Sequence, residues 1–243
     1  MPAVEQLLLN LRPRPDARLS DFAAPAWAPV VAALEAFLEA PGGLLYLRGD
    51  AGLGRSHLLS ALCGEAERRG MAALLLPLGE LRGEDPGLLQ GLEAQDLVAC
   101  DDLEAIAGQG GWEEAFFHFF NRARATGCRL LFSAAAGPGE CGFRLPDLVS
   151  RLAQAPCWAL AQPDDASREA LVMAAARRHD LALEPDVVRY LLGRGPRETG
   201  RLLALVADLD RLSLVAGRRL TIPFVREVLE RPGGQGGEPR QAG

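Results

Sequence analysis

An eight-residue stretch, GDAGLGRS at residues 49–56, constrains the fold of this 243-residue chain more than any other feature. It follows a short apolar run at 44–47 and precedes a segment, 57–69, that reads as a helix. Glycines between a strand and a helix let backbone N–H groups turn toward phosphate, and the helix N-terminus adds a favourable field. The stretch has the P-loop pattern with Arg55 in the lysine position. A glycine-rich turn that binds no ligand would look the same, so a second motif has to decide.

The rest of the chain continues this alternation of short apolar runs and helical segments. Further runs lie at 72–78, 97–100, 129–134 and 158–161, with helices expected at 29–38 and 112–125. This order predicts an α/β fold with a mostly parallel sheet that is covered on both faces. After about residue 163 only helical patterns follow. We therefore expect an extended arm at 1–20, an α/β nucleotide-binding domain at 21–163, a small all-helical lid at 164–230 and a disordered tail at 231–243.

The second motif is LVACDD at 97–102, an apolar strand that ends in two acids. This is the Walker B form, in which Asp101 would help Ser56 to hold Mg²⁺ and Asp102 could orient an attacking water. The alternative is a strand that ends in a solvated acidic turn. Because both motifs occur in the right order and context, they favour a nucleotide site. The residues expected to form it are Gly49, Gly52, Gly54, Arg55, Ser56, His57, Asp101 and Asp102.

Composition narrows the classes of function further. All 26 basic residues are arginine, which excludes a lysine nucleophile or a Schiff-base lysine, and the net charge of −6 argues against a protein that wraps duplex DNA. The planar guanidinium of Arg55 can neutralise phosphate with a geometry different from that of lysine, so we expect nucleotide binding with weakened γ-phosphate chemistry. Five scattered cysteines without a CxxC pair fit a reducing cytoplasm. The apolar runs are too short to span a bilayer.

Several segments together resemble one protein family. They are SDF at 20–22, GLGRSHLL at 52–59, DDLEAIAG at 101–108, LPDLVSRL at 145–152 and LTIPFV at 220–225. These segments resemble the DnaA-related AAA+ ATPases, and among them the Hda group of regulatory inactivators, over roughly residues 6–229. The Arg-Ser-His phosphate loop and the ending on TIPFV are themselves typical of the Hda group.

The resemblance implies further site residues. Asp21 and Phe22 match the segment that packs on the adenine, although they also fit an ordinary capped helix start. Arg151 matches the arginine finger of the group, which acts on the ATP of a neighbouring molecule; a surface salt bridge is the alternative. Arg197 matches the sensor arginine at the start of a lid helix, and its alternative is an arginine on a helix surface.

The N-terminal arm carries the sequence QLLLNL at residues 6–11. It resembles the peptide by which Hda proteins dock on the β sliding clamp of DNA polymerase III. In an extended arm, Leu7, Leu9 and Leu11 can enter hydrophobic pockets while Gln6 provides a polar anchor. Asn10 replaces the usual proline of that peptide. The alternative, a leucine-rich helix start folded on the core, is disfavoured by the RPRP that follows.

One segment departs from the family pattern. SAAAGP at 133–138 stands where a polar sensor residue and an arginine are expected, and the side chain of Ala135 cannot bond to a phosphate. The resemblance therefore implies a protein that binds ADP or ATP with Mg²⁺, has a weak ATPase of its own and acts mainly as an activator. It would inactivate DnaA by stimulating hydrolysis of the ATP bound to DnaA, together with the DNA-loaded clamp.

The same resemblance sets the expected partners and the rival functions. DnaA and the β clamp are the partners, DNA is reached only through the clamp, no membrane is involved and a homo-oligomer is possible. The protein would be cytoplasmic and associated with the nucleoid through the clamp. The rivals are an autonomous DnaA-like or helicase-loader-like ATPase acting on DNA, a small-molecule P-loop kinase, and a structural adaptor with an empty nucleotide site.

Overall fold

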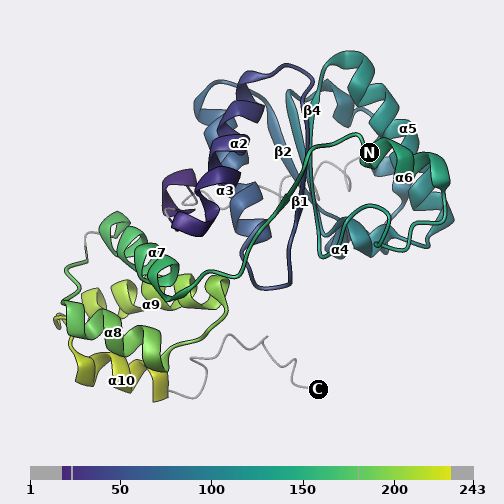
Figure 1. Cartoon of the computed structure of the whole chain (residues 1–243). Helices are drawn as coiled ribbons and strands as arrows, with labels where there is room; N and C mark the ends of the chain where they lie inside the picture. Colours follow the sequence, from purple (N-terminus) through teal and green to yellow (C-terminus); the bar gives the residue numbers. More distant parts are fainter. Residues whose placement is uncertain (1–17, 23, 180, 231–243) are drawn as a thin grey trace. The chain divides into compact units, whose positions relative to one another are not determined.

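The computed structural model describes residues 18–22, 24–179 and 181–230. The chain divides into two compact units. The first contains Ala28–Ala161, and the second contains Ser20–Trp27 together with the residues from Gln162 onward. Figure 1 shows the sheet of the first unit and the helices of the second. The candidate arm peptide with Gln6, Leu7, Leu9 and Leu11 lies outside the described residues.

The first unit is built on a five-stranded sheet in the order β2-β3-β4-β1-β5, and every strand pair in it is parallel. The strands are β1 (Leu44–Arg48), β2 (Ala73–Pro77), β3 (Leu97–Asp101), β4 (Arg129–Ala134) and β5 (Cys157–Ala159). All five residues of β3 are buried. A continuous apolar run is what a strand with both faces covered requires.

Helices cover both faces of this sheet (Figure 1). Those on one side are α2 (Ala28–Glu39) and α3 (Arg55–Arg68), and those on the other are α5 (Gly110–Thr126) and α6 (Pro146–Leu152). Between β2 and β3 lie the short helices α4 (Leu78–Leu81), η3 (Pro86–Leu89) and η4 (Leu92–Ala94), and η5 (Leu103–Ile106) follows β3. The α5 face buries Phe116, Phe119 and Phe120 against Phe132 of β4. This aromatic cluster fixes α5 on the sheet.

The second unit is helical. It consists of η1 (Leu19–Phe22), η2 (Pro25–Trp27), α7 (Asp165–Arg178), α8 (Pro185–Arg194), α9 (Thr199–Ala216) and α10 (Ile222–Glu230). Asp164 caps α7 by accepting a hydrogen bond from the Ser167 N–H at 2.8 Å. Gly217, at φ 58°, ends α9 in the left-handed conformation that glycine tolerates.

The short segment Ser20–Trp27 packs with the helical unit, whereas the sequence placed residues 21–27 in the α/β domain. The physical reason is burial. Trp27 is fully buried and Phe22 nearly so, with their rings 5.7 Å apart. The η2 turn contacts α7, and the Asp21 carboxylate pairs with Arg178 of that helix.

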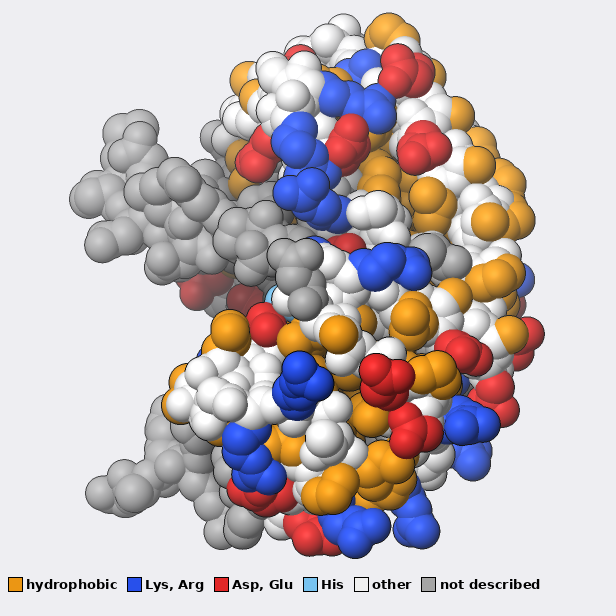
Figure 2. All heavy atoms as spheres, turned by 90° about the vertical axis from the view of Figure 1, so that its left-hand side faces the viewer, with side chains coloured by type: hydrophobic (Ala, Val, Ile, Leu, Met, Phe, Trp, Pro, Cys, Tyr) orange, Lys and Arg blue, Asp and Glu red, His pale blue; other side chains and the backbone are white. Residues whose placement is uncertain are grey.

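The predicted α/β class with a parallel sheet and a helical C-terminal part is confirmed, and element bounds shift by only a few residues. On the face drawn in Figure 2, arginine side chains are interspersed with Asp and Glu. Elsewhere in the structure, described arginines form ion pairs with nearby acids, such as Arg68 with Glu65 and Arg218 with Glu227. Within the described part of the chain, no helix is long and apolar enough to cross a membrane.

Candidate functional site

The predicted phosphate loop connects β1 to α3. Gly52 and Gly54 adopt left-handed conformations, with φ of 83° and 93°, which a residue with a Cβ would enter only with strain. Gly49 leaves little room for a side chain, because an added Cβ would lie 3.0 Å from the Leu160 Cβ. Its N–H donates to the Ala134 carbonyl at 3.1 Å, which ties the loop to the end of β4. The glycines therefore form a cradle of backbone atoms at the N-terminus of a 14-residue helix.

The first turn of α3 carries the three residues after the cradle. Ser56 is exposed, so its hydroxyl is accessible beside the loop, and His57 is half-buried. Arg55, by contrast, is buried, with 7% of its surface exposed. A cation buried to this extent needs anionic partners.

Arg55 finds those partners in the segment after β3. Its guanidinium Nη2 lies 2.8 Å from Oδ1 of Asp102, and Nη1 lies 3.5 Å from Oε1 of Glu104. The sequence predicted that Arg55 would neutralise phosphate, and it assigned no role to Glu104. In this structure the guanidinium is held by the acids of the Walker B segment. A planar group with several donors can contact two carboxylates at once, which an ammonium does less well.

The two aspartates at the end of β3 have different surroundings. Asp101 is buried, and its carboxylate Oδ1 accepts a hydrogen bond from the Ser133 hydroxyl of β4. Asp102 is half-buried at φ 52°, the one positive φ of a non-glycine residue in the described segments. Burial raises the pKa of Asp102, and the charge of Asp101 raises it further, while the nearby Arg55 guanidinium opposes the shift.

The end of β4 supplies a polar contact that sequence reasoning missed. Ser133 donates to Asp101 and accepts from the Asp102 N–H at 3.4 Å, so one hydroxyl ties both aspartates to the neighbouring strand. Ala135, which the sequence marked as a lost sensor residue, is exposed and contributes through its backbone. Its N–H donates to Oε1 of Glu104 at 3.0 Å. The parallel pairing of β3 with β4 brings these residues together.

These residues have the donors that a magnesium nucleotide requires. The glycine cradle could hold phosphate through its backbone N–H groups, and the Ser56 hydroxyl and the Asp101 carboxylate have oxygen atoms of the kind that Mg²⁺ prefers. Over the described ranges, no group of three or more His, Cys, Asp or Glu side chains could hold a metal ion by itself.

Arg151 lies in the last turn of α6. It is exposed, and its guanidinium makes no hydrogen bond or ion pair with any other described residue. The salt bridge that the sequence left open as its alternative role is therefore absent from the described part of this structure.

The remaining candidates belong to the helical unit. Asp21 is buried and paired with Arg178, and Phe22 is buried beside Trp27, so both side chains contribute to the packing of this unit. Arg197 is exposed just before α9.

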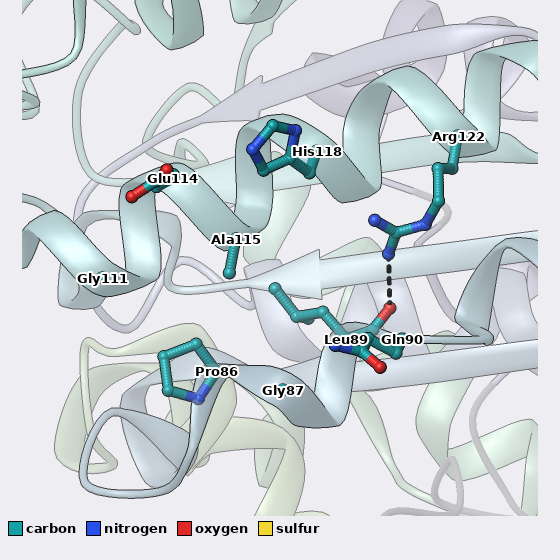
Figure 3. Close-up of a pocket in the computed structure, with 9 residues that line it drawn as sticks. All are labelled: Pro86, Gly87, Leu89, Gln90, Gly111, Glu114, Ala115, His118 and Arg122. Carbon is teal, nitrogen blue, oxygen red and sulfur yellow. Dashed lines mark hydrogen bonds between the residues drawn. The ribbon is translucent and has the colours of Figure 1, made fainter.

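The first unit also has a hollow of about 330 Å³ between η3 and α5. Figure 3 shows Glu114, Ala115, His118 and Arg122 of α5 along one side and Pro86, Gly87, Leu89 and Gln90 along the other. None of the predicted nucleotide-site residues lines this hollow. It is therefore separate from the phosphate loop.

Comparison with known proteins gives the same assignment for the fold. Residues 164–229 match the family model described as Hda, lid domain. The structure resembles domain III of the replication initiation protein DnaA from Thermotoga maritima, with a TM-score of 0.76 and 19% identity over 89% of this chain and 96% of that chain. It also resembles AMPPCP-bound DnaA from Aquifex aeolicus, with a TM-score of 0.68 and 21% identity over 84% of this chain and 68% of that one.

A more distant likeness is to the Holliday junction branch migration motor RuvB from Thermotoga maritima. Here the TM-score is 0.60, with 17% identity over 82% of this chain and 67% of that chain. These likenesses show that the chain shares the fold of these proteins, with a parallel α/β unit and a C-terminal helical part that matches the Hda lid model.

Proposed function

We propose that this chain, an Hda-like, DnaA-related AAA+ protein, is a negative regulator of DNA replication initiation. Together with the DNA-loaded β sliding clamp, it stimulates hydrolysis of the ATP bound to DnaA and leaves inactive ADP–DnaA. The observation that carries this proposal is the contrast between two arginines. Arg55 of its own site is held by two carboxylates, whereas Arg151 is exposed and unpaired among the described residues.

The chain's own site supports nucleotide binding more than turnover. ADP or ATP would bind with its phosphates in the loop of Gly49, Gly52 and Gly54, with Mg²⁺ held by Ser56 and Asp101. A bound Mg²⁺ supplies charge neutralisation on the phosphates. Asp21, Phe22, His57, Asp102 and Arg197 are the other proposed nucleotide-site residues, through their places in the resemblance.

Two groups that ATP hydrolysis would need at this site are already engaged with other residues of the chain. Asp102 is the residue that would orient an attacking water, and it is paired with Arg55 at 2.8 Å. Ala135 provides only a backbone N–H, and that group is bonded to Glu104. We therefore propose that this protein hydrolyses its own ATP slowly and acts mainly as an activator.

Arg151 would act on a neighbour. An arginine finger inserted into the ATP site of another subunit stabilises the charge that develops on the transferred phosphoryl group. Such a residue has to be solvent-exposed before the complex forms and has to stand on a rigid element. Arg151 meets the first condition, and its place on α6, whose Leu148 and Leu152 are fully buried, meets the second.

The test is a reconstituted assay of DnaA-bound ATP turnover with clamp-loaded DNA. Wild-type protein should accelerate turnover, and Arg151→Ala should lower the acceleration by about a thousandfold, since fingers contribute on this scale. Arg82→Ala, which removes another exposed arginine of the same unit, is the matched control and should behave as wild type. Equal turnover with Arg151→Ala would rule out the finger role.

The same assay tests the clamp. Replacing Leu7 and Leu9 by alanine should abolish stimulation when the clamp is supplied on DNA and should leave ADP binding intact, because the arm is separate in sequence from the nucleotide loop. Stimulation that persists without the two leucines would count against tethering by this peptide. Tight binding of the isolated protein to duplex DNA at physiological salt would favour the rival function of an autonomous ATPase acting on DNA.

A further inference from the structure

A glutamate on α5 is the most deeply buried acid of the described chain, and the nucleotide site does not use it. Glu113 lies in the first turn of α5 with 1% of its surface exposed. A carboxylate in such a place is costly unless hydrogen bonds compensate the loss of water. The hydrogen-bond partners of the Glu113 carboxylate therefore indicate its structural role.

Among the described residues, all hydrogen-bond partners of the Glu113 carboxylate are backbone N–H groups. Oε1 accepts from Gly108 at 2.6 Å and from Arg144 at 3.1 Å, and Oε2 accepts from Arg144 at 2.9 Å and from Leu145 at 2.7 Å. Hydrogen bonds to an ionised acceptor are stronger than those between neutral groups. One side chain thus binds two backbone segments that lie more than thirty residues apart.

Both segments border functional elements. Leu145 is the N-cap residue of α6, and its carbonyl accepts the first bonds of that helix from Leu148 and Val149. Its own side chain offers no capping oxygen, so Glu113 satisfies the backbone at this helix start from outside. At its other side, Gly108 follows η5, the turn that comes directly after Asp102.

We propose that Glu113 is the positioning residue for Arg151. It fixes the start of the seven-residue helix that carries Arg151 near its end, and it ties that helix to the segment after the Walker B strand. A short helix held at its N-terminus by charge-assisted bonds presents its last turn in one orientation. The inference rests on the proposed function, in which Arg151 acts on the ATP of DnaA.

The test replaces the carboxylate by an amide. In Glu113→Gln the side-chain NH₂ meets backbone N–H groups that need acceptors, so some of these bonds are lost. Glu114→Gln is the matched control, because Glu114 is the exposed neighbour that lines the hollow of Figure 3. The readout is stimulation of DnaA-bound ATP turnover as a function of regulator concentration.

A positioning role makes a specific prediction for this titration. Glu113→Gln should lower the maximal turnover about tenfold, since misplacement of a catalytic group lowers the rate by such factors, and leave the half-maximal concentration unchanged. Glu114→Gln should leave both unchanged. In an Arg151→Ala background, Glu113→Gln should not lower the residual turnover further. Full turnover with Glu113→Gln, or a loss seen only in the half-maximal concentration, would overturn the proposal.

Two further measurements keep the proposal testable if the first variant is unstable or the finger role fails. Glu113→Asp keeps the charge but shortens its reach, and should lower maximal turnover less than glutamine does; unchanged turnover overturns the proposal. Amide hydrogen exchange at Arg144 and Leu145 should be at least about tenfold faster in Glu113→Gln than in Glu114→Gln. If Arg151→Ala leaves turnover unchanged, the proposed function fails, while unchanged amide exchange refutes the anchoring itself.

Discussion

Removal of the Arg55 guanidinium should destabilise the α/β unit by a predictable amount. The perturbation is Arg55→Met, which keeps an apolar stem of similar length and deletes the charge. Breaking a buried ion pair by removing one partner costs about 3–5 kcal/mol, whereas an exposed pair contributes about 1 kcal/mol or less. The Arg55 side chain is 8% exposed, but those of Asp102 and Glu104 are 43% and 31% exposed. Solvent screening therefore places the expected cost between these limits, at about 2 kcal/mol.

Native-state hydrogen exchange of the β3 amides is the suitable assay, because it reports on the α/β unit alone. A loss of about 2 kcal/mol corresponds to exchange about thirtyfold faster, since each 1.4 kcal/mol is a factor of ten. Arg68→Ala, which removes an exposed cation from the same helix, should change exchange less than about twofold. A change below about threefold in Arg55→Met would refute the reasoning, because Arg55 would then contribute no more than a surface pair.

The pH dependence of this cost follows from Asp102. Its pKa is raised above the ordinary value of 3.8, so its ionisation disfavours the folded state, and stability falls as pH rises from that value through the raised pKa. The Arg55 charge opposes this shift, so its removal raises the pKa of Asp102 further. The destabilisation by Arg55→Met should therefore be larger at neutral pH than at pH values where Asp102 is protonated. An effect that grows as the pH is lowered would contradict this assignment.

Two further predictions concern the loop and the thiols. Gly54→Ala places a methyl group at φ 93°, which costs about 1–2 kcal/mol and distorts the cradle, so ADP binding measured by calorimetry should weaken at least tenfold; unchanged affinity would show that the loop does not hold phosphate. A thiol reagent should label Cys157 first in the native protein, because this residue is exposed, and Cys141 more slowly, because it is half-buried. Cys63, Cys100 and Cys128 are buried. Partial desolvation of the thiol by neighbouring atoms raises the pKa of Cys157 although the residue is exposed. Its labelling rate should therefore still be rising at pH 9.0, and a rate that has levelled off below that pH would contradict the shift.

The fold could be predicted from the sequence because its signals are local. Short apolar runs that alternate with helical segments predicted the strands, and the glycines at 52 and 54 permit the left-handed conformations that the phosphate loop adopts. Residues 21–27 were predicted to belong to the α/β domain but group with the helical unit, since their packing depends on Trp27 and on the pair of Asp21 with Arg178, far along the chain.

The side-chain contacts could not be predicted from the sequence, because they too join residues that lie far apart in the chain. Ser133 contacts Asp101, Glu104 contacts Ala135 and Glu113 contacts Leu145, each across 31 or more residues, and nothing in periodicity separates these three side chains from ordinary polar residues. The left-handed backbone of Asp102 has no sequence signal either, because aspartate at the end of a strand adopts many conformations.

A chain whose 26 basic residues are all arginine gives no compositional clue to which of them acts in catalysis, so the surroundings have to decide. Arg55 has its charge satisfied by Asp102 and Glu104, and a phosphate that recruited its guanidinium would have to compete with two carboxylates. Arg151 has no such competitor among the described residues, so an incoming phosphate would meet its full charge after loss of only water. The difference in available charge therefore favours action on the nucleotide of a neighbour over action on the chain's own.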